Sequence, residues 1–264
     1  MSKKKSYNLI IGGILAGSVL LMIVIGLFFL PYEPDAMNSE WKYAGISWAH
    51  PFGCDNFGRD IFTRVMVGAG NTLLVALGTV AIGAGVGILI GAFTGYFGGW
   101  LDEVMMRVID ALFAFPSILL ALVVISLMGI GRYQVIVALG TAFVPSFARV
   151  VRSEYLKQRE MDYVKNAKIM GCGHQRIMFV HILPNILPVL VPTVMIGFNN
   201  AVLAEAGLSY LGIGVQPPDA SLGRMLSEAQ TYLFSQPSYA LFPGITIVLL
   251  VLGFSLLADG LEAK

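Results

Sequence analysis

The chain alternates between long apolar runs and shorter polar segments. Apolar runs of about twenty residues are long enough to cross a membrane as helices, and six such runs can be placed. They cover residues 9–30, 72–96, 106–129, 132–151, 187–206 and 240–259, with a kink expected at Phe115-Pro116. The pattern therefore predicts an all-α polytopic membrane protein with six transmembrane helices and no soluble domain.

The longest polar run lies between the fourth and fifth spans, from Glu160 to Pro184. Apolar residues recur within it at helical spacing. Gly171 and Gly173 interrupt that spacing as a helix end would, and the Leu183-Pro184 pair ends the second half. We therefore predict a helix-turn-helix hairpin, within residues 152–186, which is suited to binding a water-soluble partner.

The distribution of Lys and Arg sets the orientation, because cytoplasmic loops of membrane proteins are enriched in both. With the N-terminus inside, twelve of the seventeen basic residues face the cytoplasm and five face outward. We therefore expect the hairpin and both termini to be cytoplasmic. Residues 1–8 then form the cytoplasmic N-terminus, and residues 9–30 form a retained first helix rather than a cleaved signal.

Composition agrees with a membrane protein. Charged residues make up 12% of the chain and hydrophobic residues 56%, whereas a soluble domain carries about 25% charged residues. The net charge of +1 indicates no attraction to nucleic acid. Cys54 and Cys172 fall on opposite sides of the membrane in this topology, so they are not expected to pair.

Residues 31–71 are predicted to form an extracytoplasmic loop ahead of a five-helix core, residues 72–264. Phe57, Ile61 and Val65 share one face at helical spacing near the end of this loop. That spacing predicts an interfacial amphipathic helix leading into the second span.

Four glycines recur at every fourth position of the second span and line one face of its helix. They are Gly83, Gly87, Gly91 and Gly95. Small residues let a second helix approach closely. We expect this face to be buried against protein, either as a contact in a moving bundle or as ordinary packing within one subunit.

Three polar residues, Asn199, Asn200 and Glu205, lie in the fifth span and are candidates for lining a translocation path. A carboxylate at mid-membrane costs about 2.5–3.5 kcal/mol, so Glu205 is expected near the outer end or at a polar cavity. An interhelical hydrogen bond is an equal alternative for the two asparagines. For Glu205 we favour such a bond or an interfacial position.

No motif for catalysis is found. The chain lacks the Gly-Lys dipeptide of a P-loop and the H-E-x-x-H and G-x-S-x-G motifs. The pairs His174/His181 and His50/Cys54 supply too few ligands to indicate a metal. The chain is therefore expected to be no enzyme and to hold no cofactor or metal. Uphill transport would need an energy source in a partner, because the spans contain almost no ionisable residues for proton coupling.

The hairpin resembles the signature loop of bacterial ABC importer permeases, in which EAA is followed by three residues, Gly, nine residues and I-x-L-P. Lys165-Asn166-Ala167 occupy the EAA position, Gly171 the glycine, and the run from His181 to Pro184 the end. Lys165, Asn166 and His181 depart from that pattern. Other stretches are similar to the second membrane subunit of the dipeptide/oligopeptide/nickel branch. They are HPFGCDNFGRDIFTRVMVGA, in which Cys54 replaces the usual Thr, DYVKNAKIMG with RIMFVHILPN, and LSYLGIGVQPPDASLG.

This resemblance implies a type I ABC importer permease in a bacterial inner membrane, in contact with lipid. Its implied partners are a homologous permease, two cytoplasmic ATPases that bind ATP and Mg, and an external solute-binding protein. The implied substrates are short peptides, nickel or metal chelates. The hairpin would dock on an ATPase through a core and a polar surround, which comprise Asp162, Tyr163, Lys165, Ala167, Lys168, Met170, Gly171 and His174.

Two other classes stay open. A secondary transporter would act alone, although it would need ionisable residues in its spans and usually an internal repeat. A membrane scaffold would explain the hairpin but not the polar Asn199-Asn200 pair. Copurification with two ATPases and a second permease would distinguish the first class from these two.

Overall fold

The structure is a computed structural model that describes residues 3–262, with side chains placed from Tyr7 to Leu261. Residues 1–2 and 263–264, and with them the basic residue Lys264 counted above, lie outside the described residues. All regular secondary structure in the described range is helical. Five helices are long and apolar enough to span a membrane. They are α1 (Lys3–Phe28), α2 (Ile61–Phe97), α5 (Arg132–Arg159), α8 (Leu183–Tyr210) and α10 (Pro237–Glu262).

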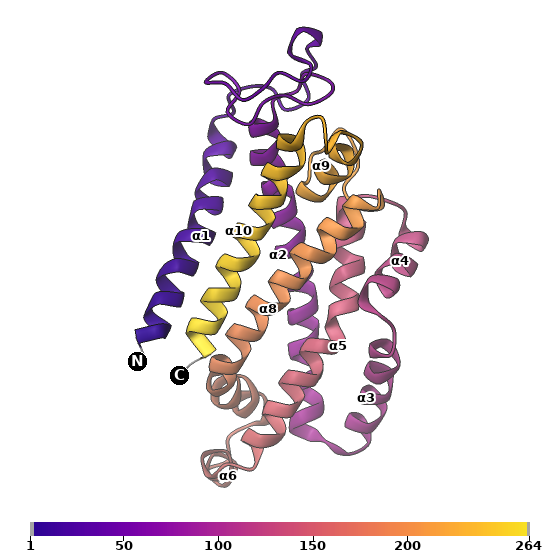
Figure 1. Ribbon diagram of the computed structural model, residues 1–264. Helices are drawn as coiled ribbons and strands as arrows, with labels where there is room; N and C mark the ends of the chain where they lie inside the picture. The colour runs from indigo at the N-terminus through magenta and orange to yellow at the C-terminus, as the bar shows by residue number, and fades with distance from the viewer. Residues whose placement is uncertain (1–2, 263–264) are drawn as a thin grey trace.

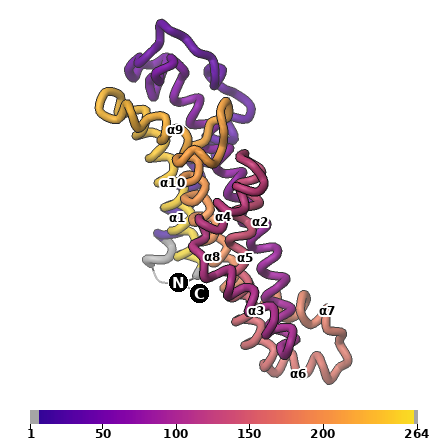
Figure 2. The backbone as a smooth tube through the Cα atoms, turned by 90° about the vertical axis from the view of Figure 1, so that its right-hand side faces the viewer, coloured from indigo at the N-terminus to yellow at the C-terminus, as the bar shows by residue number. Residues whose placement is uncertain are grey.

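The long helices run side by side (Figure 1). Helix α1 packs along α10, and α2 packs along α5. The termini and the short helix α6 (Asp162–Ile169) lie at one end of the bundle, and residues 31–60 lie with α9 (Leu222–Ala229) at the other. In the second view, α6 and α7 (His174–Arg176) extend past the level of the termini (Figure 2). The hairpin therefore projects from the end opposite the large loop.

The third predicted span is not one helix. Helix α3 (Gly99–Phe113) and α4 (Ser117–Met128) are bent by 91° at the break between them. Pro116 lacks an N–H group and disfavours the helical conformation in Phe115, so the chain breaks where the sequence predicted a kink. The 12 residues of α4 are too few to cross a membrane alone. Six spans are reached only if the bent pair counts as one.

The predicted interfacial helix is not a separate element either. Helix α2 begins at Ile61 and runs for 37 residues into the membrane span, and the Asp60 carboxylate caps it by accepting from the Thr63 N–H. Ile61 and Val65 are fully buried in the main hydrophobic core. Two residues of the predicted apolar face are therefore packed against protein, whereas Phe57, ahead of the helix, is exposed.

The glycine face of α2 lies against α5 of the same chain. A Cβ atom added at Gly87 would lie 2.6 Å from the Cβ of Phe147, and one added at Gly91 would lie 2.5 Å from the carbonyl oxygen of Ala148. Such distances are well inside van der Waals contact. The two helices therefore approach backbone to backbone, which only glycine allows.

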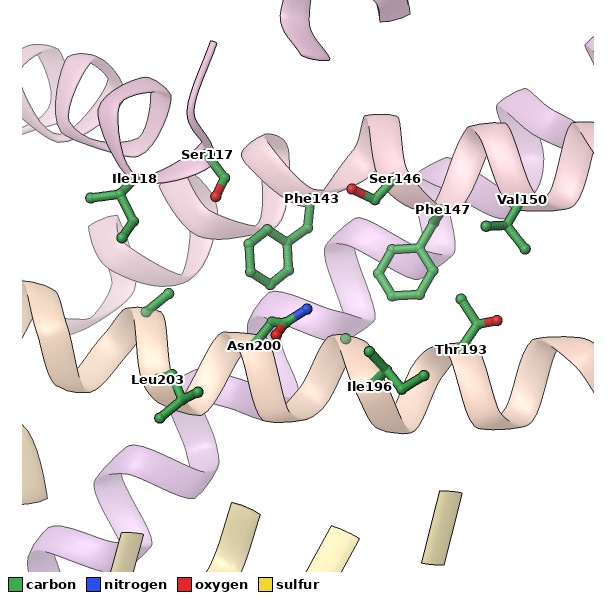
Figure 3. Close-up of a pocket in the computed structure, with 12 residues that line it drawn as sticks. Ser117, Ile118, Phe143, Ser146, Phe147, Val150, Thr193, Ile196, Asn200 and Leu203 are labelled. Carbon is green, nitrogen blue, oxygen red and sulfur yellow. The ribbon is translucent and has the colours of Figure 1, made fainter. Parts of the chain in front are cut away.

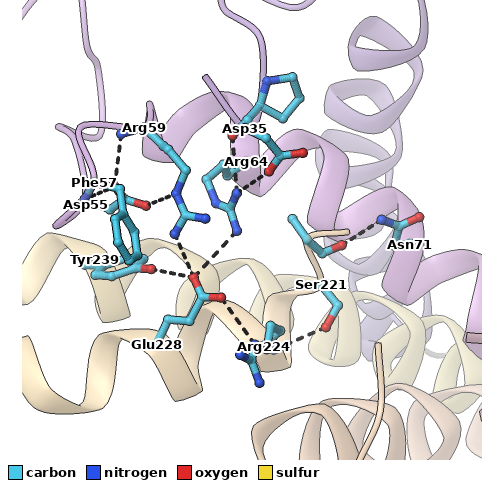
Figure 4. A network of polar contacts seen from close by, with 12 residues as sticks. Asp35, Asp55, Phe57, Arg59, Arg64, Asn71, Ser221, Arg224, Glu228 and Tyr239 are labelled. Atoms are coloured by element: carbon cyan, nitrogen blue, oxygen red, sulfur yellow. Dashed lines mark hydrogen bonds and ion pairs between the residues drawn. The ribbon is translucent and has the colours of Figure 1, made fainter. Parts of the chain in front are cut away.

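The outer end of the bundle is held by charged groups around Glu228 of α9 (Figure 4). Its carboxylate accepts from Arg59 Nη2 at 2.9 Å and from the Tyr239 hydroxyl at 2.8 Å. Arg64 Nη2 lies 3.6 Å away, and the same guanidinium donates to Asp35 at 2.7 Å. One carboxylate thus joins the external loop and the start of α2 to α9 and α10.

Burial raises the pKa of Glu228, but Arg64, the Tyr239 hydroxyl and Arg59 outweigh it, so that the pKa lies below its ordinary value. A carboxyl group whose pKa is lowered by folding stabilises the fold above its unfolded pKa. That contribution is lost as the pH falls through the folded pKa. The outer network is therefore expected to weaken in acid.

Gly87→Ile should lower the thermal stability of the purified protein, because overpacking costs about 1–3 kcal/mol or more where the backbone cannot move. Gly85→Ile is the matched control, since a Cβ at Gly85 meets nothing within 4 Å. Thermal unfolding in detergent measures both variants. Equal melting temperatures would show that the α2–α5 contact is not tight.

Glu228→Gln should lower the melting temperature at neutral pH, because two buried guanidinium groups lose their shared carboxylate. The difference in melting temperature between the variant and the unsubstituted protein should shrink once the pH falls below about 4, the unfolded pKa of glutamate, because Glu228 then becomes protonated in the folded protein. Glu103→Gln is the control, because its ion pair with Arg107 is exposed and such pairs contribute little. A difference in melting temperature that stays constant with pH would contradict a stabilising role for the ionised Glu228 carboxylate.

Candidate functional site

The hairpin between α5 and α8 consists of α6, α7 and a π-helical turn, Ile177–Ile182. Gly171 lies between α6 and α7 with φ of +78°, a left-handed conformation that favours glycine. The Gly171 N–H donates to the Lys168 carbonyl, and the Cys172 N–H donates to the Ala167 carbonyl. These two bonds form a Schellman motif that ends α6. The turn therefore depends on Gly171.

The outer surface of α6 exposes large apolar side chains. Ile169 and Met170 are 82% and 83% exposed, and Tyr163 and Met161 are partly exposed. Exposed apolar groups clustered in this way mark an interaction surface. We define Tyr163, Ile169 and Met170 as the hairpin surface.

Seven of the eight predicted docking residues are exposed, and one is not. Ala167 is half-buried and packs against the cluster beneath the hairpin. Ile169 is exposed beside Met170, although the stripe of Tyr163, Ala167 and Met170 in the sequence did not include it. The docking role of these residues stays a prediction.

The inner side of the hairpin is fixed to the long helices. Val164, Ile177 and Met178 are buried together with Tyr155 of α5. The Tyr155 hydroxyl donates to the Met178 carbonyl at 3.0 Å. The hairpin is therefore attached to the end of α5 by apolar packing and by a hydrogen bond.

A second link joins the hairpin to α2. The Tyr96 hydroxyl and His174 Nδ1 share a hydrogen bond of 2.9 Å. The Lys168 ammonium lies 5.5 Å from the centre of the Tyr96 ring, within the range of a cation–π contact. Arg159 Nη1 donates to the Gly95 carbonyl at 3.3 Å. The hairpin is therefore held at the ends of both close-packed helices.

A cavity of about 400 Å³ lies between α4, α5 and α8, within the membrane-spanning part (Figure 3). Phe143 and Phe147 reach it from α5, and Asn200 reaches it from α8. Its other polar groups are hydroxyls, from Ser117, Ser146 and Thr193. The lining is therefore mostly apolar, with four polar side chains and no charged one.

The structure separates the three polar residues of the fifth predicted span. Asn200 lines the cavity, whereas Asn199 and Glu205 do not; that any of the three lines a translocation path stays a prediction. Asn199 is buried on another side of α8, since successive residues of a helix point about 100° apart. Glu205 is fully buried near the outer end and accepts from the Ser209 hydroxyl at 2.6 Å.

One cluster was not recognised from the sequence. His50, Cys54 and Asp60 are buried together in the external loop, and their ligand atoms all lie within 4.8 Å of one another. In the sequence, His50 and Cys54 stand out only as a weak pair without Asp60. The spacing of the three residues gives no signal by itself, because only the fold of the loop brings Asp60 back to the other two.

Comparisons with known proteins agree with this architecture. Residues 87–264 match the family model described as binding-protein-dependent transport system inner membrane component. The chain is 38% identical over 259 residues to the dipeptide transport system permease protein DppC of Alkalihalophilus pseudofirmus, covering 98% of this chain and 85% of the relative. It is 38% identical over 248 residues to the glutathione transport system permease protein GsiD of Pectobacterium atrosepticum, covering 92% and 82%.

A helical membrane protein with a projecting hairpin at one end and a cavity of about 400 Å³ between its spans has the architecture of a transport permease. The chain belongs to the family of binding-protein-dependent transport system inner membrane components and is a permease subunit of an ABC importer. It is a non-catalytic, multi-pass protein of the inner membrane that works with ATPase and substrate-binding partners. The secondary-transporter and scaffold alternatives are thereby set aside.

Gly171→Leu should abolish most ATP-dependent uptake while leaving the protein in the membrane. A side chain in the left-handed region costs about 1–3 kcal/mol, which shifts the turn and the hairpin surface. Gly173→Leu is the matched control, because Gly173 has φ of −66° and open space around its Cα. Uptake by the assembled complex measures both, and unchanged uptake with Gly171→Leu would refute the role of the turn.

Proposed function

We propose that this chain forms half of the translocation path for short peptides delivered by an external binding protein. The observation that carries the proposal is the cavity of about 400 Å³ with its uncharged hydroxyl and amide groups. Such groups both donate and accept hydrogen bonds, which matches the alternating donors and acceptors of a peptide backbone. The relatives' names, dipeptide and glutathione permease, support the same class of substrate.

Nickel or a metal chelate is the other substrate class indicated by the sequence. A nickel ion is bound by imidazole, thiolate or carboxylate groups. None of the cavity's lining residues is His, Cys, Asp or Glu. The cavity therefore favours a peptide over a bare metal ion.

The ATPase contact is assigned to the hairpin surface, with its apolar side chains in a groove of the ATPase. Lys165, Lys168 and Asp162 are exposed around it and supply charged contacts at the edge. ATP and Mg bind in the two ATPases, and this chain holds neither. Closure of the ATPases then moves the hairpin, and with it α2 and α5.

A similar but distinct permease is proposed to complete the path. Ile196, Asn200 and Leu203 of α8 are exposed beside the cavity, so one wall of the cavity is left open to a neighbour. We propose that both termini lie in the cytoplasm, because they lie at the same end of the bundle as the hairpin. Residues 152–186 alone contain six of the seventeen basic residues of the chain.

The test is uptake by the complete complex in proteoliposomes, with the binding protein outside and ATP inside. Labelled dipeptides, glutathione and radioactive nickel are compared side by side. ATP-dependent uptake of a peptide is expected. Uptake of nickel without any peptide would contradict the proposal.

Substitutions in the cavity make that test specific. Asn200→Leu and Thr193→Val should reduce peptide uptake by up to about tenfold each, because each removes a hydrogen bond to the substrate. Thr141→Val is the matched control, since Thr141 is exposed on α5 outside the cavity lining. Equal uptake by all three variants would show that the substrate does not pass through this cavity.

A further inference from the structure

The external loop contains three metal-ligating side chains of different chemistry in one buried place. His50, Cys54 and Asp60 are each less than 7% exposed, and their ligand atoms lie within 4.8 Å of one another. An antiparallel bridge pairs Cys54 with Asp60, which folds the chain back on itself. His50 Nδ1 lies 2.9 Å from Asp60 Oδ1. The backbone therefore brings the three groups together.

We propose that His50, Cys54 and Asp60 form a binding site for a divalent metal ion, with Zn²⁺ as the best match. Zinc takes imidazole nitrogen, thiolate sulfur and carboxylate oxygen at about 2.0–2.3 Å. Tetrahedral geometry at these lengths puts ligand atoms roughly 3.3–3.6 Å apart. To reach that spacing, the His50–Asp60 pair, now at 2.9 Å, would open by roughly 0.4–0.6 Å. The pairs with Cys54, which lie within 4.8 Å, would settle at the same spacing. Water would complete the four-coordinate shell.

The surroundings of the cluster hold its ligands in place. Asp60 Oδ2 accepts from the Thr63 N–H and the Thr63 hydroxyl, both at 2.7 Å, which turns Oδ1 toward His50. The His50 ring packs against both Tyr32 and Trp41, with ring centres 4.8 Å and 4.9 Å away. Such supporting contacts orient metal ligands and strengthen binding by about 10–100-fold.

The location gives the metal a structural role. Asp60 also caps the first turn of α2, and neighbouring Arg59 joins the Glu228 network. A metal held at Asp60 would therefore fix the external loop to the start of α2 and to α9. The site is far along the chain from the hairpin and independent of the substrate proposed for the cavity.

Metal content of the full-length protein, purified without a polyhistidine tag and reloaded with Zn²⁺ after chelation, tests the site. About one zinc ion per chain is expected after removal of loosely bound metal. Cys54→Ser should abolish zinc binding. Cys172→Ser, which alters the second cysteine of the chain, in the hairpin, should leave zinc binding unchanged. Absence of zinc from the unsubstituted protein, or equal zinc in the unsubstituted protein and both variants, would overturn the proposal.

The absorption spectrum of bound Co²⁺ and the melting temperature give two independent readouts. Neither requires the Cys54→Ser variant to fold stably. Co²⁺ in this site should show a thiolate charge-transfer absorption, which Cys172→Ser retains. Zinc should raise the melting temperature of the unsubstituted protein in proportion to its binding to the folded state. A cobalt complex without thiolate absorption, or a melting temperature that zinc leaves unchanged, would overturn the assignment.

Discussion

The backbone-to-backbone contact between α2 and α5 is the constraint on which the rest of the structure depends. Helices in lipid associate without a hydrophobic driving force between them, so close packing must hold them together. The glycine face of α2 makes that packing possible, because a Cβ at Gly87 or Gly91 would collide with α5. This pair of helices extends from the external loop to the hairpin, and α5 also supplies Phe143 and Phe147 to the cavity.

The two ends of this helix pair are held by different kinds of contact. At the outer end, Glu228 gathers charged groups from the loop, α2 and α9. At the inner end, Tyr155 and Tyr96 each form one hydrogen bond with the hairpin. Apolar packing against the long helices also holds the hairpin in place. The hairpin surface is left free for a partner while its inner side is fixed. This arrangement would allow a movement of the hairpin to reach the cavity through α5, which contacts both.

Hydropathy and glycine spacing were sufficient to predict five long apolar helices, the hairpin and its turn at Gly171, because each is dictated locally. A kink at Pro116 was also predicted, but its 91° angle and the division into two helices were not, since proline fixes where a helix ends but not the direction of the next one. Which of Asn199 and Asn200 lines the cavity depends on the rotation of α8 against its neighbours. The proximity of Asp60 to His50 and Cys54 depends on the fold of an irregular loop, which no periodic pattern in the sequence indicates.

Two distances, measured by electron spin resonance in the assembled complex, show whether the hairpin and the α2–α5 pair are rigidly connected. Spin labels at Gln175 in the hairpin and at Tyr133 at the outer end of α5 report whether the two move together. The account predicts that their separation changes by less than about 2 Å between nucleotide states, while the distance from Tyr133 to the neighbouring permease changes clearly. A large nucleotide-dependent change within this chain would contradict a rigid connection between hairpin and helix pair.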